Sequence, residues 1–301
     1  RAFAECTNLS QISLPEGLQS IFGQAFCNCG SLATLSIPAV VSDFRIDEGA
    51  LTGCTSLYSI EIDSANPNYQ AVDSIVYSKD GRGLLFVTKN RATVTIPSHV
   101  VYIGGSAFAG CNYLTAIDIP SGVTSIGFSA FANCVSLSSV AFHGSNINLS
   151  LEQCFWGTPY LENLAEGFVL SQGRCAIAYN GKMPDYVELP DGCVGFSMGL
   201  FNNRGICGVR LPSSIRSIPG RAFEGCRNLE SVEIAEGCVE IGEVAFGSCS
   251  RLSSLSLPTT VSTIGGSAFS GCSNLETLTL PPTISTIGNY AFSGCSSLTS
   301  L

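Results

Sequence analysis

The chain has few charged residues and almost no histidine. Only 12% of its 301 residues are Asp, Glu, Lys or Arg, and only two are His. An average globular protein carries roughly 25% charged residues. The net charge is −9, and no basic cluster is present that could neutralise phosphates. This composition argues against nucleic acids and anionic membranes as partners.

Long apolar runs and catalytic motifs are also missing. No stretch of ~18 or more apolar residues occurs, so we expect no membrane insertion within this segment. The sequence contains no P-loop, nucleophile elbow or zinc-protease helix. Neither His99 nor His143 has a carboxylate or a nucleophile at a spacing typical of a catalytic site. We therefore expect neither an enzyme nor a cofactor.

One short motif, however, returns at a fixed spacing of 23 residues. It consists of Ala-Phe followed by a Cys three residues after the Phe, and four consecutive copies are 222–226, 245–249, 268–272 and 291–295. The same spacing separates Phe3 from Phe26 and Phe108 from Phe131. A constant period of this length indicates a solenoid built from stacked coils.

The residues between the motifs have a constant pattern as well. A Leu follows each Cys by three residues, then comes an alternating apolar pair and often a Pro, as in Leu252–Pro258. Alternation predicts a short strand with one apolar face, and Pro ends it. A single coil cannot bury both faces of its Phe. Stacked coils can, so we expect each Phe ring to pack against the rings of the neighbouring coils.

This L-x-x-L-x-L pattern with inward Cys and Phe resembles the BspA-like class of leucine-rich repeats, found in surface proteins of anaerobic and gut bacteria and of some protozoa. Eleven coils can be anchored, at Phe3, Phe26, Leu51, Phe108, Phe131, Phe155, Phe201, Phe223, Phe246, Phe269 and Phe292. The resemblance implies a mainly β fold with residues 1–301 as a single leucine-rich repeat solenoid. It would be a right-handed curved stack of about eleven coils, with parallel strands on one face and short turns or irregular helical segments on the other.

Two insertions interrupt the repeat, at residues 63–92 and 156–184. In the first, the apolar runs Ile75–Ser78 and Leu84–Val87 surround an Asp-Gly turn, which predicts a β-hairpin. In the second, Phe168–Leu170 and Cys175–Tyr179 surround a Ser-Gln-Gly-Arg turn and predict another. Each insertion is either a widened repeat or a protruding loop that holds a binding site. The second interpretation draws attention to their aromatic residues, which are Tyr69, Trp156, Tyr160 and Tyr179.

Cysteine is abundant, with 15 residues, and nine of them occupy the same repeat position. These nine are Cys6, Cys29, Cys54, Cys111, Cys134, Cys226, Cys249, Cys272 and Cys295. Neighbouring coils would bring their Cα atoms ~5 Å apart, a distance that permits disulfides. We expect free, buried thiols instead, because each disulfide would use the cysteines of two adjacent coils and the odd number would leave one cysteine unpaired. Cys27 and Cys29 have the wrong spacing for zinc, so no metal site is expected.

The outward positions of the predicted strands form a polar, mildly acidic ladder. Its acidic members are Glu61, Asp118, Glu188 and Glu233, whereas the last coils carry Ser and Thr. Such a ladder is either a solvated surface or a binding face. Together with the insertion aromatics it gives the candidate partner-binding residues, which are Glu61, Asp118, Trp156, Tyr160, Tyr186, Glu188, Arg210 and Glu233.

The resemblance implies an extracellular or cell-surface, adhesin-like module that binds protein ligands on host or microbial surfaces as a monomer and has no enzymatic activity. Because the chain begins and stops inside a repeat, we expect it to be a piece of a longer protein whose signal peptide and anchor lie outside it. Two alternatives remain. One is a passive spacer that projects another domain, and the other is a carbohydrate-binding accessory module, which would need exposed aromatic side chains.

Overall fold

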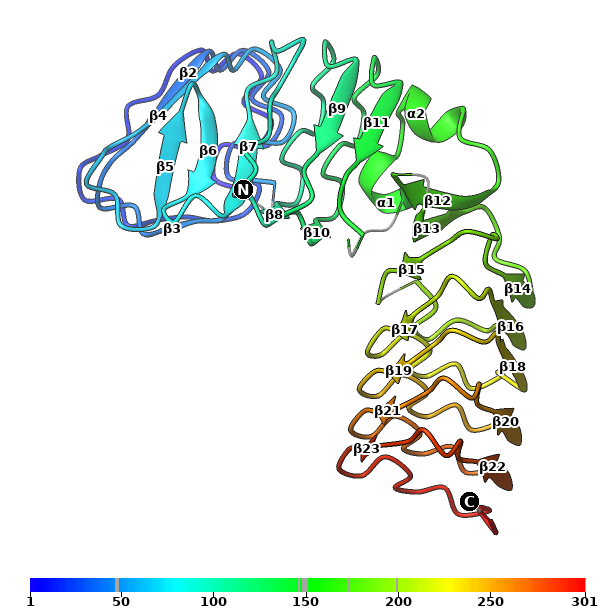
Figure 1. Ribbon diagram of the computed structural model, residues 1–301. Coiled ribbons are helices and arrows are strands. Elements are labelled where there is room, and N and C mark those ends of the chain that lie inside the picture. Colours follow the sequence, from blue (N-terminus) through cyan, green and yellow to red (C-terminus); the bar gives the residue numbers. More distant parts are fainter. Residues whose placement is uncertain (47–48, 146, 148–150, 173, 199, 301) are drawn as a thin grey trace. The chain divides into compact units, whose positions relative to one another are not determined.

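The computed structural model describes residues 1–46, 49–145, 147, 151–172, 174–198 and 200–300 (Figure 1). The protein is mainly β and forms a solenoid of about eleven turns, as the repeat predicted. The chain divides into two compact units, Arg1–Ala165 and Glu166–Leu301, which we call unit 1 and unit 2.

In both units, most coils contribute one strand of three or four residues at their alternating apolar pair. In unit 1, β2 (Thr34–Ile37) pairs in parallel with β4 (Ser59–Ile62), and β9 (Ala116–Ile119) pairs with β11 (Ser139–Phe142). In unit 2, β14 (Tyr186–Glu188), β16 (Gly208–Leu211) and β18 (Ser231–Ile234) form one parallel sheet, and β20 (Ser254–Ser256) pairs with β22 (Thr277–Thr279). The apolar residues of these strands face the core and the polar ones face solvent.

A second, narrower ladder of parallel strands runs at or near the residue that precedes each anchor by five positions, which is usually an Ile. In unit 1 it consists of β1 (Ser20–Ile21) with β3 (Asp43–Phe44), and of β8 (Tyr102–Ile103) with β10 (Ser125–Ile126). In unit 2, β17 (Ser217–Ile218), β19 (Glu240–Ile241), β21 (Thr263–Ile264) and β23 (Thr286–Ile287) follow one another. The sequence did not predict this ladder, because a two-residue strand leaves no alternation to detect.

Both insertions contain the predicted hairpins. In the first, β6 (Ile75–Ser78) lies antiparallel to β7 (Gly83–Val87), and an additional strand, β5 (Tyr69–Val72), lies antiparallel to β6. In the second, β12 (Gly167–Ser171) lies antiparallel to β13 (Cys175–Asn180). The last strand of each hairpin continues the narrow ladder, since β7 pairs in parallel with β8 and β13 with β15 (Gly195–Phe196). The hairpins are therefore built into the stacks of their own units.

Two short helices follow the last regular coil of unit 1. They are α1 (Leu151–Phe155) and α2 (Pro159–Glu162). Thr158 caps α2, because its Oγ1 accepts a hydrogen bond from the Leu161 amide at 3.2 Å. Pro159 stands in the first turn, where no amide donor is needed.

The phenylalanines stack as predicted. In unit 2 the rings of Phe201, Phe223, Phe246, Phe269 and Phe292 follow one another at centroid distances of 5.1 to 5.4 Å, with interplanar angles of 12° or less. In unit 1 Phe131 stacks between Phe108 and Phe155, at 4.7 and 5.0 Å. The backbone supports these stacks, since most of the Phe amides donate to the Ala carbonyl before the Phe of the next coil, as from Phe246 to Ala268 at 2.7 Å, and the Phe131 amide donates to the Cys154 carbonyl at 2.9 Å.

All nine repeat cysteines are free thiols, as predicted. Seven of them are buried, whereas Cys295 is partly exposed and Cys6 is exposed, so the expectation of burial was wrong for these two. Cys6 lies in the coil of Phe3, which packs against the coil of Phe26. Most of the thiols also have a hydrogen bond that the sequence did not reveal. Seven of them donate to the carbonyl of the Phe in the preceding coil at 2.9 to 3.1 Å, and they are Cys29, Cys54, Cys134, Cys226, Cys249, Cys272 and Cys295.

Glycine at the corner after the narrow strand allows the coils to approach closely. A Cβ on Gly265 would lie 2.6 Å from the Glu243 amide nitrogen of the preceding coil, and backbone cannot move aside without shifting the stack. We expect Gly265→Ala to lower the free energy of unfolding by ~1–3 kcal/mol through this overpacking, measured by urea denaturation. Gly17→Ala is the control, because a Cβ there would meet nothing within 4 Å. Equal stability of the two variants would contradict the prediction.

Candidate functional site

Four of the predicted residues lie together on the sheet face of unit 2. Glu188 on β14 is opposite Arg210 on β16, and Arg210 is opposite Glu233 on β18. Tyr186 also lies on β14, on the same side as Glu188, because Val187 between them points into the core. The strands β14, β16 and β18 follow one another in unit 2 (Figure 1), and their parallel pairing brings together residues that are 22 and 23 positions apart in the sequence.

The interactions among these four side chains are weak. Arg210 Nη1 lies 3.8 Å from Glu188 Oε2, and their side chains are 46% and 60% exposed. An ion pair with this exposure contributes ~0–1 kcal/mol, so a ligand could replace it at little cost. The Tyr186 hydroxyl donates a hydrogen bond to Glu233 Oε1 at 3.0 Å. Partial desolvation and the Glu233 carboxylate raise the pKa of Tyr186, which keeps it a donor.

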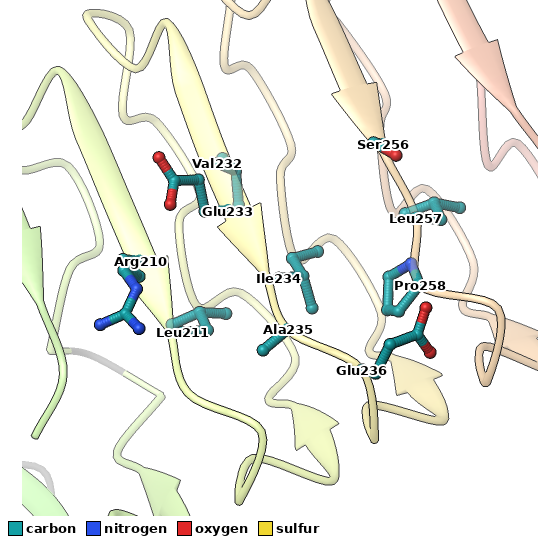
Figure 2. Close-up of a pocket in the computed structure, with 10 residues that line it drawn as sticks. All are labelled: Arg210, Leu211, Val232, Glu233, Ile234, Ala235, Glu236, Ser256, Leu257 and Pro258. Carbon is teal, nitrogen blue, oxygen red and sulfur yellow. The ribbon is translucent and has the colours of Figure 1, made fainter. Parts of the chain in front are cut away.

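A hollow of about 390 Å³ adjoins this group (Figure 2). Arg210, Glu233 and Glu236 are its charged lining residues, and Leu211, Ile234 and Leu257 are among the apolar ones. Hydrogen bonds from the Thr259 amide and hydroxyl, both at 3.0 Å, lower the pKa of Glu236 and keep it ionised. The hollow thus combines an apolar surface with a net negative charge, a combination that can accept the long stem and charged end of a Lys or Arg side chain.

A second hollow of about 390 Å³ lies in unit 1 and contains another predicted residue, Asp118 on β9. Thr95 and His143 line it beside Asp118, and Ile96 and Ile117 are among its apolar residues. Glu61 is exposed on β4, whose sheet is β2–β4, so it shares no sheet with Asp118. The three-stranded first insertion lies between these two segments in the sequence. The acidic ladder is therefore continuous only in unit 2.

The insertion aromatics differ in their exposure. Trp156 is 64% exposed, whereas Tyr160 is partly buried and its ring packs edge-on against Phe155 at 5.1 Å. Burial raises the pKa of Tyr160 to about 12. Tyr69 packs against Phe44 at 6.1 Å, and Tyr179 packs against Phe168 at 5.0 Å. Three of the four rings therefore have packing partners in their own unit, and only Trp156 presents most of its surface to solvent.

Two features of the site were missed by sequence reasoning. Glu236 lies beyond the strand in a turn, where the repeat pattern gives no orientation. Five further aromatics are more than half exposed although no binding role was assigned to them, and they are Phe22, Tyr58, Tyr113, Phe128 and Tyr290. Their places outside the anchor positions were the available signal, although such a place does not by itself imply exposure, since Phe44 and Phe142 are also outside them and are buried.

Neither a metal centre nor a membrane span occurs in the part of the chain that the structure describes. Among those residues, no group of three or more His, Cys, Asp and Glu side chains is arranged to hold a metal ion. No helix in the same ranges combines the length and the apolar composition needed to cross a bilayer.

The stacked coils, the two parallel ladders and the polar sheet face define a leucine-rich repeat solenoid. The family described as BspA type leucine rich repeat region matches the sequence in 6 copies, over residues 1–76, 84–166 and 178–301. The chain belongs to this BspA-type leucine-rich repeat family. No match was found among curated proteins.

Solved structures of several bacterial leucine-rich repeat proteins are similar to this chain. One, from Bacteroides ovatus, is 24% identical with a TM-score of 0.41, and the match covers 93% of this chain and 80% of that one. A leucine rich cell surface protein from Faecalibacterium prausnitzii is 25% identical with a TM-score of 0.44, over 78% of this chain and 62% of that one. The pneumococcal vaccine antigen PcpA is 17% identical with a TM-score of 0.42, over 91% and 66% of the two chains. The matched part is thus less than two thirds of the Faecalibacterium protein and of PcpA.

Proposed function

We propose that this chain is an extracellular, cell-surface module without enzymatic activity that binds protein ligands on host or microbial surfaces, acting as a monomer. The observation that carries the proposal is the open polar face of unit 2, where Tyr186, Glu188, Arg210 and Glu233 adjoin the hollow lined by Glu236. Membership of a family found in surface proteins supports the location. The charges on this face are solvated and weakly paired, as a surface that exchanges partners requires.

The ligand chemistry that fits this face is an extended segment with Lys or Arg side chains. Glu188, Glu233 and Glu236 outnumber Arg210, so the face carries a net negative charge at neutral pH. Cationic side chains can form ion pairs with these carboxylates while their stems cover Leu211 and Leu257.

The double substitution Glu188→Ala with Glu233→Ala tests the face directly, because it removes two of the carboxylates that would pair with Lys or Arg. We expect it to weaken binding to a mucosal or matrix protein captured by the wild-type protein by ~10-fold or more, measured by surface plasmon resonance. The matched control is Glu230→Ala with Glu240→Ala, which removes two exposed carboxylates of unit 2 that do not line the hollow. Unchanged affinity in the first double variant would remove the sheet face from the proposal.

A passive spacer is the second candidate, and the outward residues of β20 and β22 favour it. These strands present Ser254, Ser256, Thr277 and Thr279, which are small and uncharged. Failure of the wild-type protein to capture any ligand would favour the spacer. The carbohydrate-binding alternative now depends on Trp156, since the other insertion aromatics are packed. Loss of glycan binding in Trp156→Ala would support it.

A further inference from the structure

Lys89 lies in the core of unit 1, although a lysine side chain is ordinarily charged. It follows β7 by two residues and is 4% exposed. Among the described residues, its Nζ is the one buried side-chain nitrogen or oxygen that has no hydrogen-bond partner. The sequence gave no reason to expect this, because a Lys in an insertion is ordinarily solvated. An unpartnered buried amine needs a physical explanation.

Backbone hydrogen bonds place Lys89 between two coils of unit 1. The Val87 amide donates to the Ala107 carbonyl at 2.9 Å, the bond that a Phe makes in a regular coil. The Lys89 amide approaches the Leu57 carbonyl at 3.4 Å. The segment 87–89 therefore takes the place of an anchor between the coil of Leu51 and that of Phe108.

The surroundings of the Lys89 amine are apolar or weakly polar. Nζ lies 4.5 Å from the centroid of the Phe86 ring. The ionisable groups that act on it are the thiols of Cys54, Cys111 and Cys134. The thiols of Cys54 and Cys134 are buried and remain protonated at neutral pH, burial having raised the pKa of Cys54 to about 12. The hydrogen bond with the Cys134 thiol lowers the pKa of Cys111, but no hydrogen bond joins Cys111 to the Lys89 amine. Arg91, the nearest cation along the chain, donates to the Asp73 carbonyl and to Thr88 Oγ1 instead.

These surroundings favour the neutral amine over the ammonium ion. A buried ammonium loses its hydration, and one aromatic ring restores only a part of that free energy. Burial accordingly lowers the pKa of Lys89 from its usual range. In the unfolded chain the amine regains its ordinary affinity for protons, so unfolding takes up a proton over the pH range between the two values. The stability of this region therefore falls as the pH falls through that range.

We propose that Lys89 lies in the core as a neutral amine and that its protonation on acidification releases the segment 83–91 from the neighbouring coils, which makes this segment a pH-sensitive weak point of unit 1. The route to water is short, because Asn90 and Ala92 beside it are already exposed. Release would separate the coil of Leu51 from that of Phe108. This inference is independent of ligand binding by unit 2.

Hydrogen exchange with mass spectrometry tests the proposal between pH 5.5 and 8.5, under reducing conditions and after correction for intrinsic exchange rates. We expect the protection of peptides covering 83–91 to fall at least tenfold over this range, relative to peptides from β20 and β22. Lys89→Met should abolish the fall. Lys79→Met, a substitution of an exposed lysine in the same insertion, should retain it. His99 lies against Gly81 at the hairpin tip and is present in both variants. Any contribution of His99 to the pH dependence is therefore the same in both.

The same pH dependence in wild type and Lys89→Met would overturn the proposal. A second measurement does not depend on the folding of the variant, namely the 15N chemical shift of the Lys89 amine in the wild-type protein. A neutral-amine shift at pH 8.5 that changes to an ammonium shift on acidification supports the proposal. An ammonium shift throughout the range, with unchanged protection, refutes it.

Discussion

Replacing Phe246 with alanine is expected to lower the free energy of unfolding by ~3–5 kcal/mol. The Phe246 ring is fully buried and stacks between Phe223 at 5.2 Å and Phe269 at 5.3 Å. Its removal therefore breaks two ring contacts in the middle of unit 2. The cavity cannot close easily, because the ladders of hydrogen bonds on either side fix the spacing of the coils. Since a whole domain is stable by only ~5–15 kcal/mol, we expect the melting temperature to fall by roughly 10 °C.

Circular dichroism during thermal and urea unfolding measures this effect. Phe128→Ala is the control, because the Phe128 side chain is 67% exposed and its loss should change stability by less than ~0.5 kcal/mol. If Phe246→Ala unfolds at the same urea concentration as Phe128→Ala, the ring stack does not stabilise the solenoid. The ring contacts on both faces of Phe246 would then contribute nothing measurable to stability.

At pH 10 the protein is expected to be less stable than at pH 8 by several kcal/mol, because most of its repeat cysteines are buried. Burial raises the pKa of Cys226 to about 11 and that of Cys272 to about 12. The unfolded thiols ionise near pH 8.5, so the stabilisation from keeping them protonated is complete below that value and is lost as the pH rises towards 11 to 12. Ionisation of each such thiol in the unfolded chain lowers the free energy of unfolding by ~2 kcal/mol by pH 10.

Urea unfolding at pH 8, 9 and 10 with a reducing agent checks this prediction, with fluorescence or circular dichroism as the signal. Cys272→Ser should flatten the pH dependence, because the hydroxyl can donate to the Phe246 carbonyl as the thiol does but does not ionise in this range. Cys6→Ser should leave it unchanged, since Cys6 occupies the same repeat position but is exposed. Constant stability from pH 8 to 10 in the wild-type protein would contradict the prediction.

Much of the fold could be predicted because each coil touches only its neighbours. The 23-residue spacing of Phe246 and Phe269 translates directly into ring stacking. The same spacing predicts that Arg210 lies beside Glu233, since residues one period apart become lateral neighbours in a parallel ladder. The group on the sheet face of unit 2 was therefore accessible from spacing alone, although its role in binding remains a prediction.

The prediction from sequence was less accurate in the segments where the 23-residue repeat is interrupted. Glu61 and Asp118 were assigned to one ladder, but the first insertion separates their strands into different sheets. Tyr160 and Trp156 stand four residues apart, yet one packs on Phe155 and the other is exposed. No periodicity gives the direction of a side chain in such a segment. The direction depends on which coil the segment meets.

The sequence by itself determined the repeat, the inward Phe, Cys and Leu positions, the hairpins and the mild acidity of the sheet face. These properties follow from local spacing, which a nearest-neighbour stack preserves. Only the tertiary structure decided that repeat thiols donate to Phe carbonyls, that Glu236 adjoins the hollow, and that the Lys89 amine is enclosed without a partner. Each of these depends on contacts between a residue and a different coil, whose distance and burial arise only when the coils are packed together.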